Sequence, residues 1–261
     1  GYEEAAAQGI LAGINAACAL LEREPLILTR DMGYLGVMVD DLVVKGTDEP
    51  YRMMTSRSEY RLLLRQDNAD LRLTELSHAR GLASERRMAL VERKREGTGR
   101  LLGALHAVRL PASPARDAWL SRHHQPVTAA TLTAEDLLRR PDIALGSLKE
   151  LCPELAGFPA DVEQQAELSV KYEGYLKKQQ AQVARARAME DWRIPEDIDY
   201  DCIESLRIEA RQKLKAKKPL SLSQAGRIPG VNPADVAVLM VWLKRRRDGG
   251  EAPVTREKGQ P

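Results

Sequence analysis

Arginine and tyrosine side chains are concentrated between Glu49 and Thr74, in the segment EPYRMMTSRSEYRLLLRQDNADLRLT, which contains five arginines and two tyrosines. The forked guanidinium groups of arginine match phosphate oxygens, so this segment could bind an anion such as a nucleic-acid backbone. Its tyrosines could stack on unpaired bases, although tyrosines of this kind more often lie at the edge of a core. The alternative for the arginines is pairing with nearby acids, namely Asp67, Asp70 and Glu75. Because charged stripes on helices usually face solvent, the pattern alone favours this alternative.

A second group of cations lies in the C-terminal part of the chain. Eleven lysines and arginines and only two acids occur from Arg207 to Arg247, a net charge of +9, whereas the whole chain carries +2. This segregation is expected of a nucleic-acid contact, and a solvated basic tail explains it equally well. Here an apolar helix leads into IPGV, and Asn232-Pro233 has the residue types that begin a second helix. The arrangement resembles a helix-hairpin-helix, whose turn amides can face a phosphate.

Other residues that could support chemistry do not form a recognisable site. Asp40 and Asp41 are adjacent, so they should point to different sides of a helix or strand and share no metal or acid–base site. The pair His123-His124 has no further ligands at metal spacing. The three cysteines, Cys18, Cys152 and Cys202, are far apart and lack a CxxC pattern, which argues against zinc and disulfides and fits a reducing cytoplasm. We therefore predict no catalytic and no metal-binding residue.

The elements that must position these side chains are predicted to be mainly α-helical. Alanine, leucine, glutamate and arginine dominate, aromatic residues make up only 4%, and this composition favours helices. Ser56 and Glu59 have capping-box spacing, so a helix is predicted to open at Thr55-Ser56 and to end at QDNAD. The interval of four residues would then place three arginines on one helical face, namely Arg57, Arg61 and Arg65.

Further helices are predicted over residues 1–22, 34–44, 74–81, 84–96, 133–140 and 161–191. Gly97 and Gly99 should weaken the fourth of these, and residues 110–130, which contain three prolines, are predicted to be a surface loop. Pro195 marks a boundary before a small C-terminal module. No apolar run approaches the ~18 residues of a membrane span, and no signal peptide is apparent. The chain does not begin with methionine, which suggests a piece of a longer protein.

Five runs of sequence resemble the C-terminal part of one family, in the order in which that family has them. They are GYEEAAAQGILAGINAA, YLGVMVDDLVVKGTDEPYRMMTSRSEYRLLLRQDNADLRLTE, EDLLRRPDI, VKYEGYLKKQQ and SLSQAGRIPGVNPADVAVLMVWLK. The family is glucose-inhibited division protein A, the FAD-binding subunit of an enzyme that adds 5-carboxymethylaminomethyl groups to wobble uridines of tRNA. The second run is long and specific. Residues 91–128 resemble the family least.

The resemblance implies a flavin cofactor at the start of the chain. GYEEA matches the last segment of the family's FAD-binding domain, where a helix N-terminus faces the flavin, and it assigns flavin contact to Gly1, Tyr2, Glu3, Glu4 and Ala5. The family's GxGxxG and its flavin-proximal cysteines have no counterpart in this chain. We therefore expect the chain alone to be inactive. The complete enzyme would use FAD, NADH as reductant and a folate one-carbon donor.

The resemblance also implies partners: tRNA, a GTPase subunit of the same complex and a second copy in a homodimer, all in the cytoplasm. It favours tRNA contact by Arg52, Arg57, Arg61 and Arg65, and at the C-terminal module by Arg227, Lys244, Arg245 and Arg246. The expected domains are a final FAD-domain helix (1–24), a connecting segment (25–82), a helical domain (83–194) and a helical partner- and tRNA-binding module (195–261). The main alternative is a helical scaffold that binds the GTPase without touching tRNA. A DNA-binding helix-hairpin-helix protein, based only on Ile228–Pro233, is a third reading.

Overall fold

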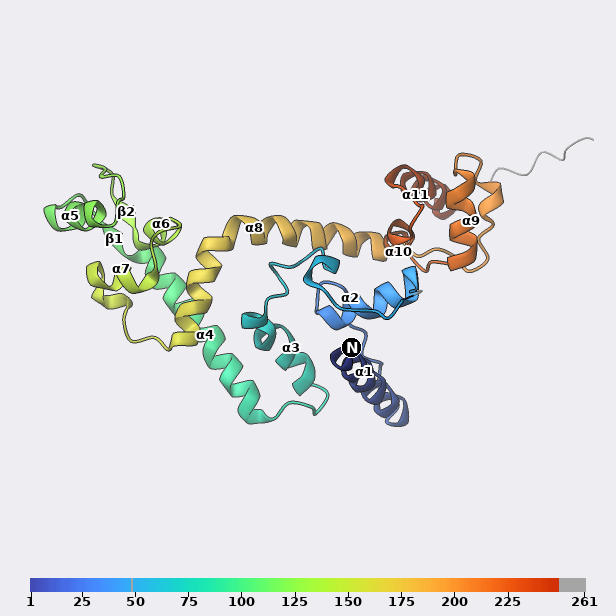
Figure 1. The fold of residues 1–261 in the computed structure, drawn as a ribbon, viewed down its shortest axis with the longest axis horizontal. Helices are drawn as coiled ribbons and strands as arrows, with labels where there is room; N and C mark the ends of the chain where they lie inside the picture. Colours follow the sequence, from blue (N-terminus) through green and yellow to red (C-terminus); the bar gives the residue numbers. More distant parts are fainter. Residues whose placement is uncertain (48, 249–261) are drawn as a thin grey trace, which may run out of the picture. The chain divides into compact units, whose positions relative to one another are not determined.

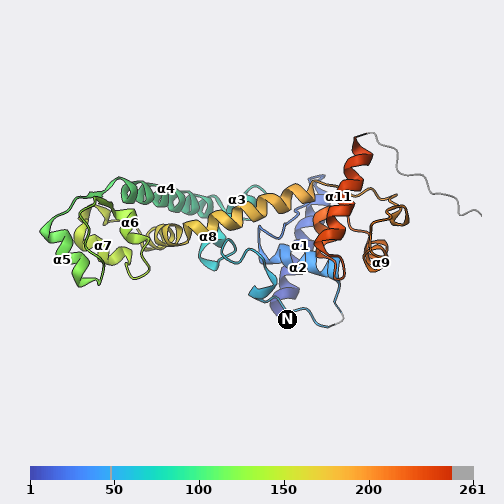
Figure 2. The same ribbon diagram turned by 90° about the horizontal axis from the view of Figure 1, so that it is seen from above.

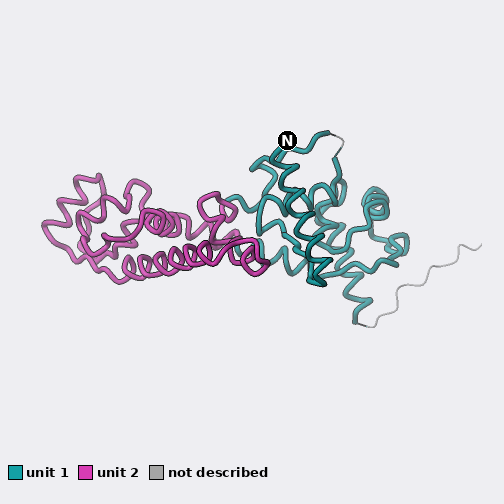
Figure 3. The backbone as a smooth tube through the Cα atoms, turned by 90° about the horizontal axis from the view of Figure 1, so that it is seen from below, with its two compact units in different colours: residues 1–61, 180–261 teal, residues 62–179 magenta. Residues whose placement is uncertain are grey.

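The computed structural model describes residues 1–47 and 49–248, and the chain divides into two compact units (Figures 1 and 3). The first unit combines residues 1–61 with residues 180 onward, and the second comprises residues 62–179. Helix α8 (Ala160–Glu190) contributes its first part to the second unit and its last part to the first. Helices dominate both units, which confirms the predicted mainly α class.

The first unit contains the two cationic regions singled out above, except for Arg65 and Arg72, which belong to the second. Its N-terminal half has helices α1 (Tyr2–Leu20) and α2 (Tyr34–Asp40), a π-helical turn at Asp41–Lys45 and a single 3-10 turn at Thr55–Arg57. Its C-terminal half has the end of α8, a 3-10 turn at Tyr200–Cys202 and helices α9 (Ile208–Lys217), α10 (Leu222–Arg227) and α11 (Pro233–Arg247).

One apolar core joins the two halves of the first unit. Val44 from the π-helical turn belongs to the same buried cluster as Leu214, Leu222 and Leu239 from α9, α10 and α11. Burying each such side chain contributes roughly 1.5–3 kcal/mol, so the C-terminal helices stabilise the segment around Val44 as well as one another. The predicted start of α11 is confirmed, because Asn232 caps the helix and Pro233 occupies its first position.

The second unit packs around the start of α8. Its elements are a 3-10 turn at Gln66–Asn68, α3 (Ala69–His78), α4 (Glu85–Ala107), β1 (Arg109–Leu110), α5 (Pro114–Arg122), β2 (Leu132–Thr133), α6 (Ala134–Leu138), α7 (Leu145–Leu151) and a 3-10 turn at Pro153–Leu155. Strands β1 and β2 pair antiparallel. Leu101 and Leu105 of α4 share a core with Val162 and Ala166 near the start of α8; both helices are labelled in Figure 2.

Three predictions about the second unit were wrong for identifiable reasons. Helix α4 continues through Gly97 and Gly99, because Gly97 lies so close to α8 that an added Cβ would stand 2.9 Å from a methyl group of Val162. Residues 110–130 contain α5, which uses Pro114 as its first residue and the Ser113 hydroxyl as its cap. Helix α3 begins at Ala69 and not near residue 74. The helices after Thr133 and over 161–191 are confirmed.

None of the helices within residues 1–47 and 49–248 is both long enough and apolar enough to span a bilayer.

Candidate functional site

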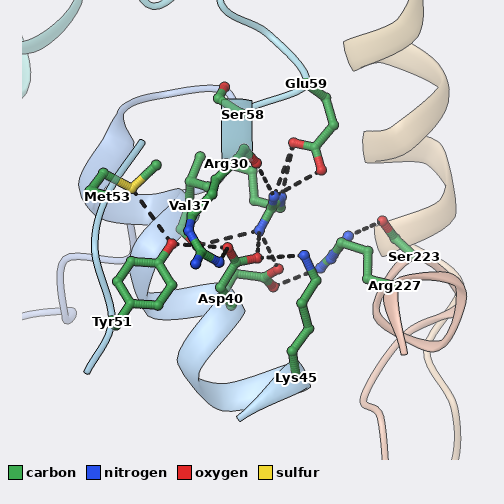
Figure 4. A network of polar contacts seen from close by, with 12 residues as sticks. Arg30, Val37, Asp40, Lys45, Tyr51, Met53, Ser58, Glu59, Ser223 and Arg227 are labelled. Atoms are coloured by element: carbon green, nitrogen blue, oxygen red, sulfur yellow. Dashed lines mark hydrogen bonds and ion pairs between the residues drawn. The ribbon is translucent and has the colours of Figure 1, made fainter. Parts of the chain in front are cut away.

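A buried guanidinium lies at the centre of the N-terminal half of the first unit (Figure 4). Only 7% of Arg30 is exposed. Its Nη1 donates to Asp40 Oδ2 at 2.9 Å and to Asp41 Oδ1 at 2.8 Å. Its Nη2 donates to Glu59 Oε1 at 2.8 Å and to the carbonyl oxygen of Arg57 at 3.2 Å. We call Arg30 and the charged side chains linked to it the Arg30 network.

A glycine brings Arg30 to the end of α2. At Gly36 an added Cβ would lie 2.2 Å from the carbonyl oxygen of Thr29, so the backbone just before Arg30 crosses directly over the helix. The π-helical turn at Asp41–Lys45 then widens the end of the helix. Both carboxylates, of Asp40 and of Asp41, consequently reach one nitrogen of Arg30. The sequence predicted no shared metal or acid–base site for these neighbouring acids; what they share is the Arg30 guanidinium, whose several N–H groups can donate to both.

Buried charges in the Arg30 network stabilise one another. Burial by itself would raise the pKa of Asp41, but hydrogen bonds from Lys45, Arg30 and Tyr51 outweigh it and hold the pKa below its ordinary value. Burial would lower the pKa of Arg30, and its bonds to Glu59 and Asp41 raise it instead. Burial together with the bond to Asp41 raises the pKa of Tyr51 to about 12. At neutral pH Asp41 and Arg30 are therefore charged and Tyr51 is protonated.

The residues that the Arg30 network holds in place are 51–61, which we call the arginine segment. The Tyr51 hydroxyl donates to Asp41 Oδ2 at 2.9 Å, and the Met53 N–H donates to Glu4 Oε1 at 2.9 Å. The Arg57 guanidinium lies over the Tyr51 ring, 4.5 Å from its centroid. Such a cation–π contact contributes about 0.5–1 kcal/mol at an exposed site. Polar side chains thus anchor the segment, which contains little regular secondary structure.

The predicted helix through the arginine segment was wrong. Only Thr55–Arg57 form a helical turn, and Ser58 has extended dihedral angles, with φ −95° and ψ 130°. A helix there would withdraw the Arg57 carbonyl from Arg30 and Ser58 from its buried position. The arginines at 57, 61 and 65 therefore share no helical face.

These arginines also differ in their surroundings. Within the part of the chain that the structure describes, the exposed side chains of Arg52 and Arg61 have no hydrogen bond or ion pair. Arg57 is partly exposed above Tyr51. Arg65 instead pairs with Asp67 at 3.0 Å and donates to the carbonyl of Leu62. Arg52, Arg57 and Arg61 are consequently more accessible to an anion than Arg65.

The predicted cations of the C-terminal module separate in the same way. Arg227 is largely buried and pairs with Asp40 at 2.7 Å and with Glu190 at 2.9 Å, so it belongs to the Arg30 network. Arg246 pairs with Asp197 at 3.1 Å. Lys244 and Arg245 are exposed at the end of α11, and no described residue forms a hydrogen bond or an ion pair with the side chain of either. Among the four predicted cations, these two are the most accessible.

The turn before α11 has its own acid. Asp235 accepts from the backbone N–H of Asn232 at 2.9 Å and pairs with Arg207 at 2.7 Å. Asn232 in turn accepts from the Asp235 N–H. Because a carboxylate already occupies this helix N-terminus, the turn offers little to a phosphate, and the helix-hairpin-helix reading gains no support from these contacts.

The residues predicted to face a flavin form the start of α1. Tyr2 is 94% exposed, and α1 begins without a side-chain cap. A pocket of about 350 Å³ lies beside this end of the helix and is lined by Glu3, Glu4, Ala7, Tyr34, Leu35, Met38 and Met53. Met53 links the pocket to the arginine segment, since its N–H binds Glu4.

Metal binding and cysteine chemistry find no support in the described residues. No group of three or more histidines, cysteines and acids there could hold a metal ion. His123 packs against Trp119, with the ring centroids 4.3 Å apart, and is not placed for ligation. Burial raises the pKa of the Cys152 thiol to about 11, which makes it a poor nucleophile.

Sequence reasoning missed Arg30, the residue with the most contacts in the site. It is a lone arginine in LILTRDMGY, with no helical periodicity and no neighbouring cation to mark it. Only the adjacent run containing Asp40 and Asp41, two of its partners, drew attention. The specific match of that run to the family is the one signal that could have led to Arg30.

Three segments match families by sequence. Residues 182–260 match the tRNA modifying enzyme MnmG/GidA C-terminal helical bundle, residues 85–180 match the MnmG/GidA C-terminal helical domain, and residues 1–24 match glucose inhibited division protein A. Among solved structures, Aquifex aeolicus GidA superposes in crystal form II with a TM-score of 0.75 at 40% identity, covering 93% of this chain and 38% of that one. Crystal form I gives 0.74, again at 40% identity, covering 93% and 37%.

Individual relatives are similar over nearly the whole chain. A tRNA uridine 5-carboxymethylaminomethyl modification enzyme MnmG from Geobacillus thermodenitrificans is 49% identical over 95% of this chain. The protein of the same name from Geobacter sulfurreducens is 50% identical over 94%. The chain spans 39% of the length of each of these relatives. From these matches and the shared fold, the chain belongs to the glucose-inhibited division protein A (MnmG/GidA) family and corresponds to its C-terminal portion.

Proposed function

We propose that this chain is the tRNA-holding part of an enzyme that adds carboxymethylaminomethyl groups to carbon 5 of tRNA uridines. The relatives that match it are named for this reaction. The observation that carries the assignment to this chain is the arginine segment, in which the exposed side chains of Arg52 and Arg61 have no partner among the described residues and Arg57 lies over Tyr51. Guanidinium groups held in this way suit RNA phosphates, and the partly exposed Tyr51 ring adds an aromatic surface.

The end of α11 would provide a second contact with tRNA. Lys244 and Arg245 are exposed in the last turn of that helix, where cations are also favoured by the helix dipole. Two separate cationic places suit a folded RNA, whose phosphates are spread over its surface. Arg65, Arg227 and Arg246, which pair with acids of this chain, would contribute less.

The start of α1 would form one edge of a flavin site. The residues present fit this role, because Tyr2 is 94% exposed and a pocket of about 350 Å³ lies beside this end of α1. Gly1, Tyr2, Glu3, Glu4 and Ala5 would line that edge. When bound, FAD would supply the redox chemistry, with NADH as reductant and a folate as one-carbon donor, while this chain would position the tRNA near it. A homodimer in the cytoplasm would be the working form.

Arg57→Glu and Arg61→Glu, each in the complete protein, test the tRNA assignment. Each variant should weaken tRNA binding about tenfold or more and reduce the slope of log affinity against log salt by about 1 for each phosphate that the protein no longer neutralises. The matched control is Arg122→Glu, which makes the same charge change at an exposed position of α5. Equal affinity of the Arg57, Arg61 and Arg122 variants across a salt series would overturn the assignment.

A helical scaffold that docks the GTPase subunit without tRNA contact is the second candidate. A pocket of about 380 Å³ favours it; apolar residues such as Ile203, Val238 and Val241 line it together with the charged residues Glu204 and Arg245, and Val241 is 52% exposed. Deleting residues 195–261 would not separate the two functions, since these helices share a core with Val44. Val241→Asp should instead break the complex with the GTPase and leave tRNA affinity intact. If Lys244→Glu and Arg245→Glu also affect only the GTPase complex, α11 is a protein-docking helix.

A further inference from the structure

Arg30 connects two parts of the first unit, which Tyr51 and Arg57 also link through Asp41. On one side, its guanidinium donates to Asp40, Asp41 and the carbonyl of Val37, all at the end of α2. On the other side, it donates to Glu59 and to the carbonyl of Arg57 in the arginine segment. Figure 4 shows these bonds radiating from one buried group. Arg30 is therefore placed to fix the position of that segment relative to α2.

The arginine segment has little structure of its own that could replace this link. Its short-range backbone bonds are those of the 3-10 turn, from Arg57 to Met54 and from Ser58 to Thr55. Tyr51 and Met53 anchor its beginning through Asp41 and Glu4. In the middle of the segment, Arg30 donates to the main-chain carbonyl oxygen of Arg57. Loss of that bond would remove this main-chain anchor and leave residues 54–59 to the contacts of the Arg57 side chain with the Arg52 carbonyl, at 2.9 Å, and with Asp41, at 4.0 Å.

Lysine could not perform the same task. The Arg30 guanidinium binds three carboxylates and two carbonyl oxygens at once, which requires its planar fork of N–H groups. A lysine ammonium has three donors at a single point and would leave several of these acceptors without a partner. The charge would be retained, but the geometry that reaches the segment from α2 would be lost.

We propose that Arg30 is a positioning residue for RNA binding: it holds the arginine segment so that Arg57 and Arg61 meet tRNA phosphates together. Glu59, which is half-exposed and bonded to Arg30, is the outer end of this arrangement. The inference rests on the proposed function, because it concerns how the same arginines are presented. Arg30 itself is buried and touches no RNA.

Glu59→Gln in the complete protein gives the sharpest test, because two explanations predict opposite signs. The substitution removes a negative charge beside the arginines, so charge alone predicts tighter tRNA binding. If Glu59 and Arg30 position the segment, the same substitution weakens binding, by about threefold to tenfold at a fixed salt concentration. Glu49→Gln is the matched control: it makes the same change in a nearby acid whose side chain has no partner among the described residues, and it should leave affinity equal or tighter.

Arg30→Lys should have the larger effect in the same direction. We expect the KM for tRNA to rise about tenfold while kcat at saturating tRNA stays near that of the wild type, because presentation and not chemistry is altered. A melting curve shows whether Arg30→Lys is folded; if it is not, Glu59→Gln, at a half-exposed position, decides alone.

The outcomes separate the inference from the proposed function. Weaker binding by Glu59→Gln and unchanged binding by Glu49→Gln would support positioning. Tighter or unchanged binding by Glu59→Gln, with Arg61→Glu still harmful, would overturn positioning and leave the proposed function intact. Unchanged binding by both Arg57→Glu and Arg61→Glu would overturn the proposed function and the inference with it.

Discussion

Two buried arginines among the described residues each hold a loop in place, one in each unit, and they do so with different partners. Arg116 in the second unit is 1% exposed and donates mainly to backbone carbonyls, of Leu110, Thr128 and Ala130, with Asp117 as its acid. Arg30 in the first unit binds three carboxylates, and these also contact Lys45, Arg57 and Arg227. Arg116 therefore connects two parts of the same loop, whereas Arg30 belongs to a network of alternating positive and negative side chains.

The difference indicates how each loop is used. Carbonyl oxygens accept most of the hydrogen bonds of Arg116, so this arginine serves to stabilise the fold of residues 110–130. The acids around Arg30 offset the repulsion between its charge and other cations nearby. The exposed arginines of residues 51–61 lie next to this group of charges. Variants that affect stability and tRNA binding separately can therefore test whether the two arginines differ in purpose.

The largest effect on stability is expected from Arg116→Met. The substitution keeps a long side chain but removes the donor of three hydrogen bonds, to the carbonyls of Leu110, Thr128 and Ala130, and at about 1 kcal/mol each this should lower the free energy of unfolding by about 3 kcal/mol. Urea unfolding followed by circular dichroism measures this decrease. The folded variant should bind tRNA as the wild type does. A fall in affinity without unfolding would mean that the Arg116 loop also serves RNA and that the comparison fails.

A matched pair of glycines is expected to give the next largest effect. At Gly36 an added Cβ meets the carbonyl oxygen of Thr29 at 2.2 Å, and that backbone must move, carrying Arg30 with it. At Gly97 the Cβ meets a methyl group of Val162 at 2.9 Å, and a side chain can adjust. Gly36→Ala should cost about 1–3 kcal/mol of stability and also weaken tRNA binding. Gly97→Ala should cost less, because alanine is the better helix residue, and should leave binding unchanged.

Thermal melting and tRNA titration of both glycine variants check this prediction. The comparison would be broken if Gly97→Ala weakened tRNA binding as much as Gly36→Ala does, since the second unit would then influence the RNA surface equally.

An element can be predicted from the sequence when the residues that stabilise it are close to it along the chain. The helix after Thr133 is decided by a capping box within four residues, and the long helix over 161–191 by its own composition, so both are predicted correctly. The extended arginine segment is decided by Arg30, which lies 27 residues from Arg57 along the chain. Local pattern there favours a helix, and the buried contacts of Ser58 and the Arg57 carbonyl override it.

The candidate site is predictable to the same limited degree. Residue type alone identified the arginines that turn out to be exposed, such as Arg61, and equally those paired within the chain, such as Arg227. Whether an arginine side chain is exposed depends on whether the fold places an acidic side chain beside it. Asp40 and Glu190 are 187 and 37 residues away from Arg227, so no spacing rule reveals either pair.

The smallest expected effect is a loss of stability at acidic pH. It tests whether the charged network around Arg30 contributes to the stability of the first unit. The folded-state pKa of Asp41 lies below its ordinary value of 3.8, as does that of Glu190 below 4.5. A carboxyl with a lowered pKa stabilises the fold fully above its unfolded pKa, and this stabilisation is lost as the pH falls through the folded value. The first unit should therefore lose stability below about pH 4, and Asp41→Asn should lose less on further acidification than the wild type. Urea midpoints at pH 7 and pH 3 measure this, and an equal pH dependence for wild type and Asp41→Asn would show that Asp41 is not coupled to folding through Arg30.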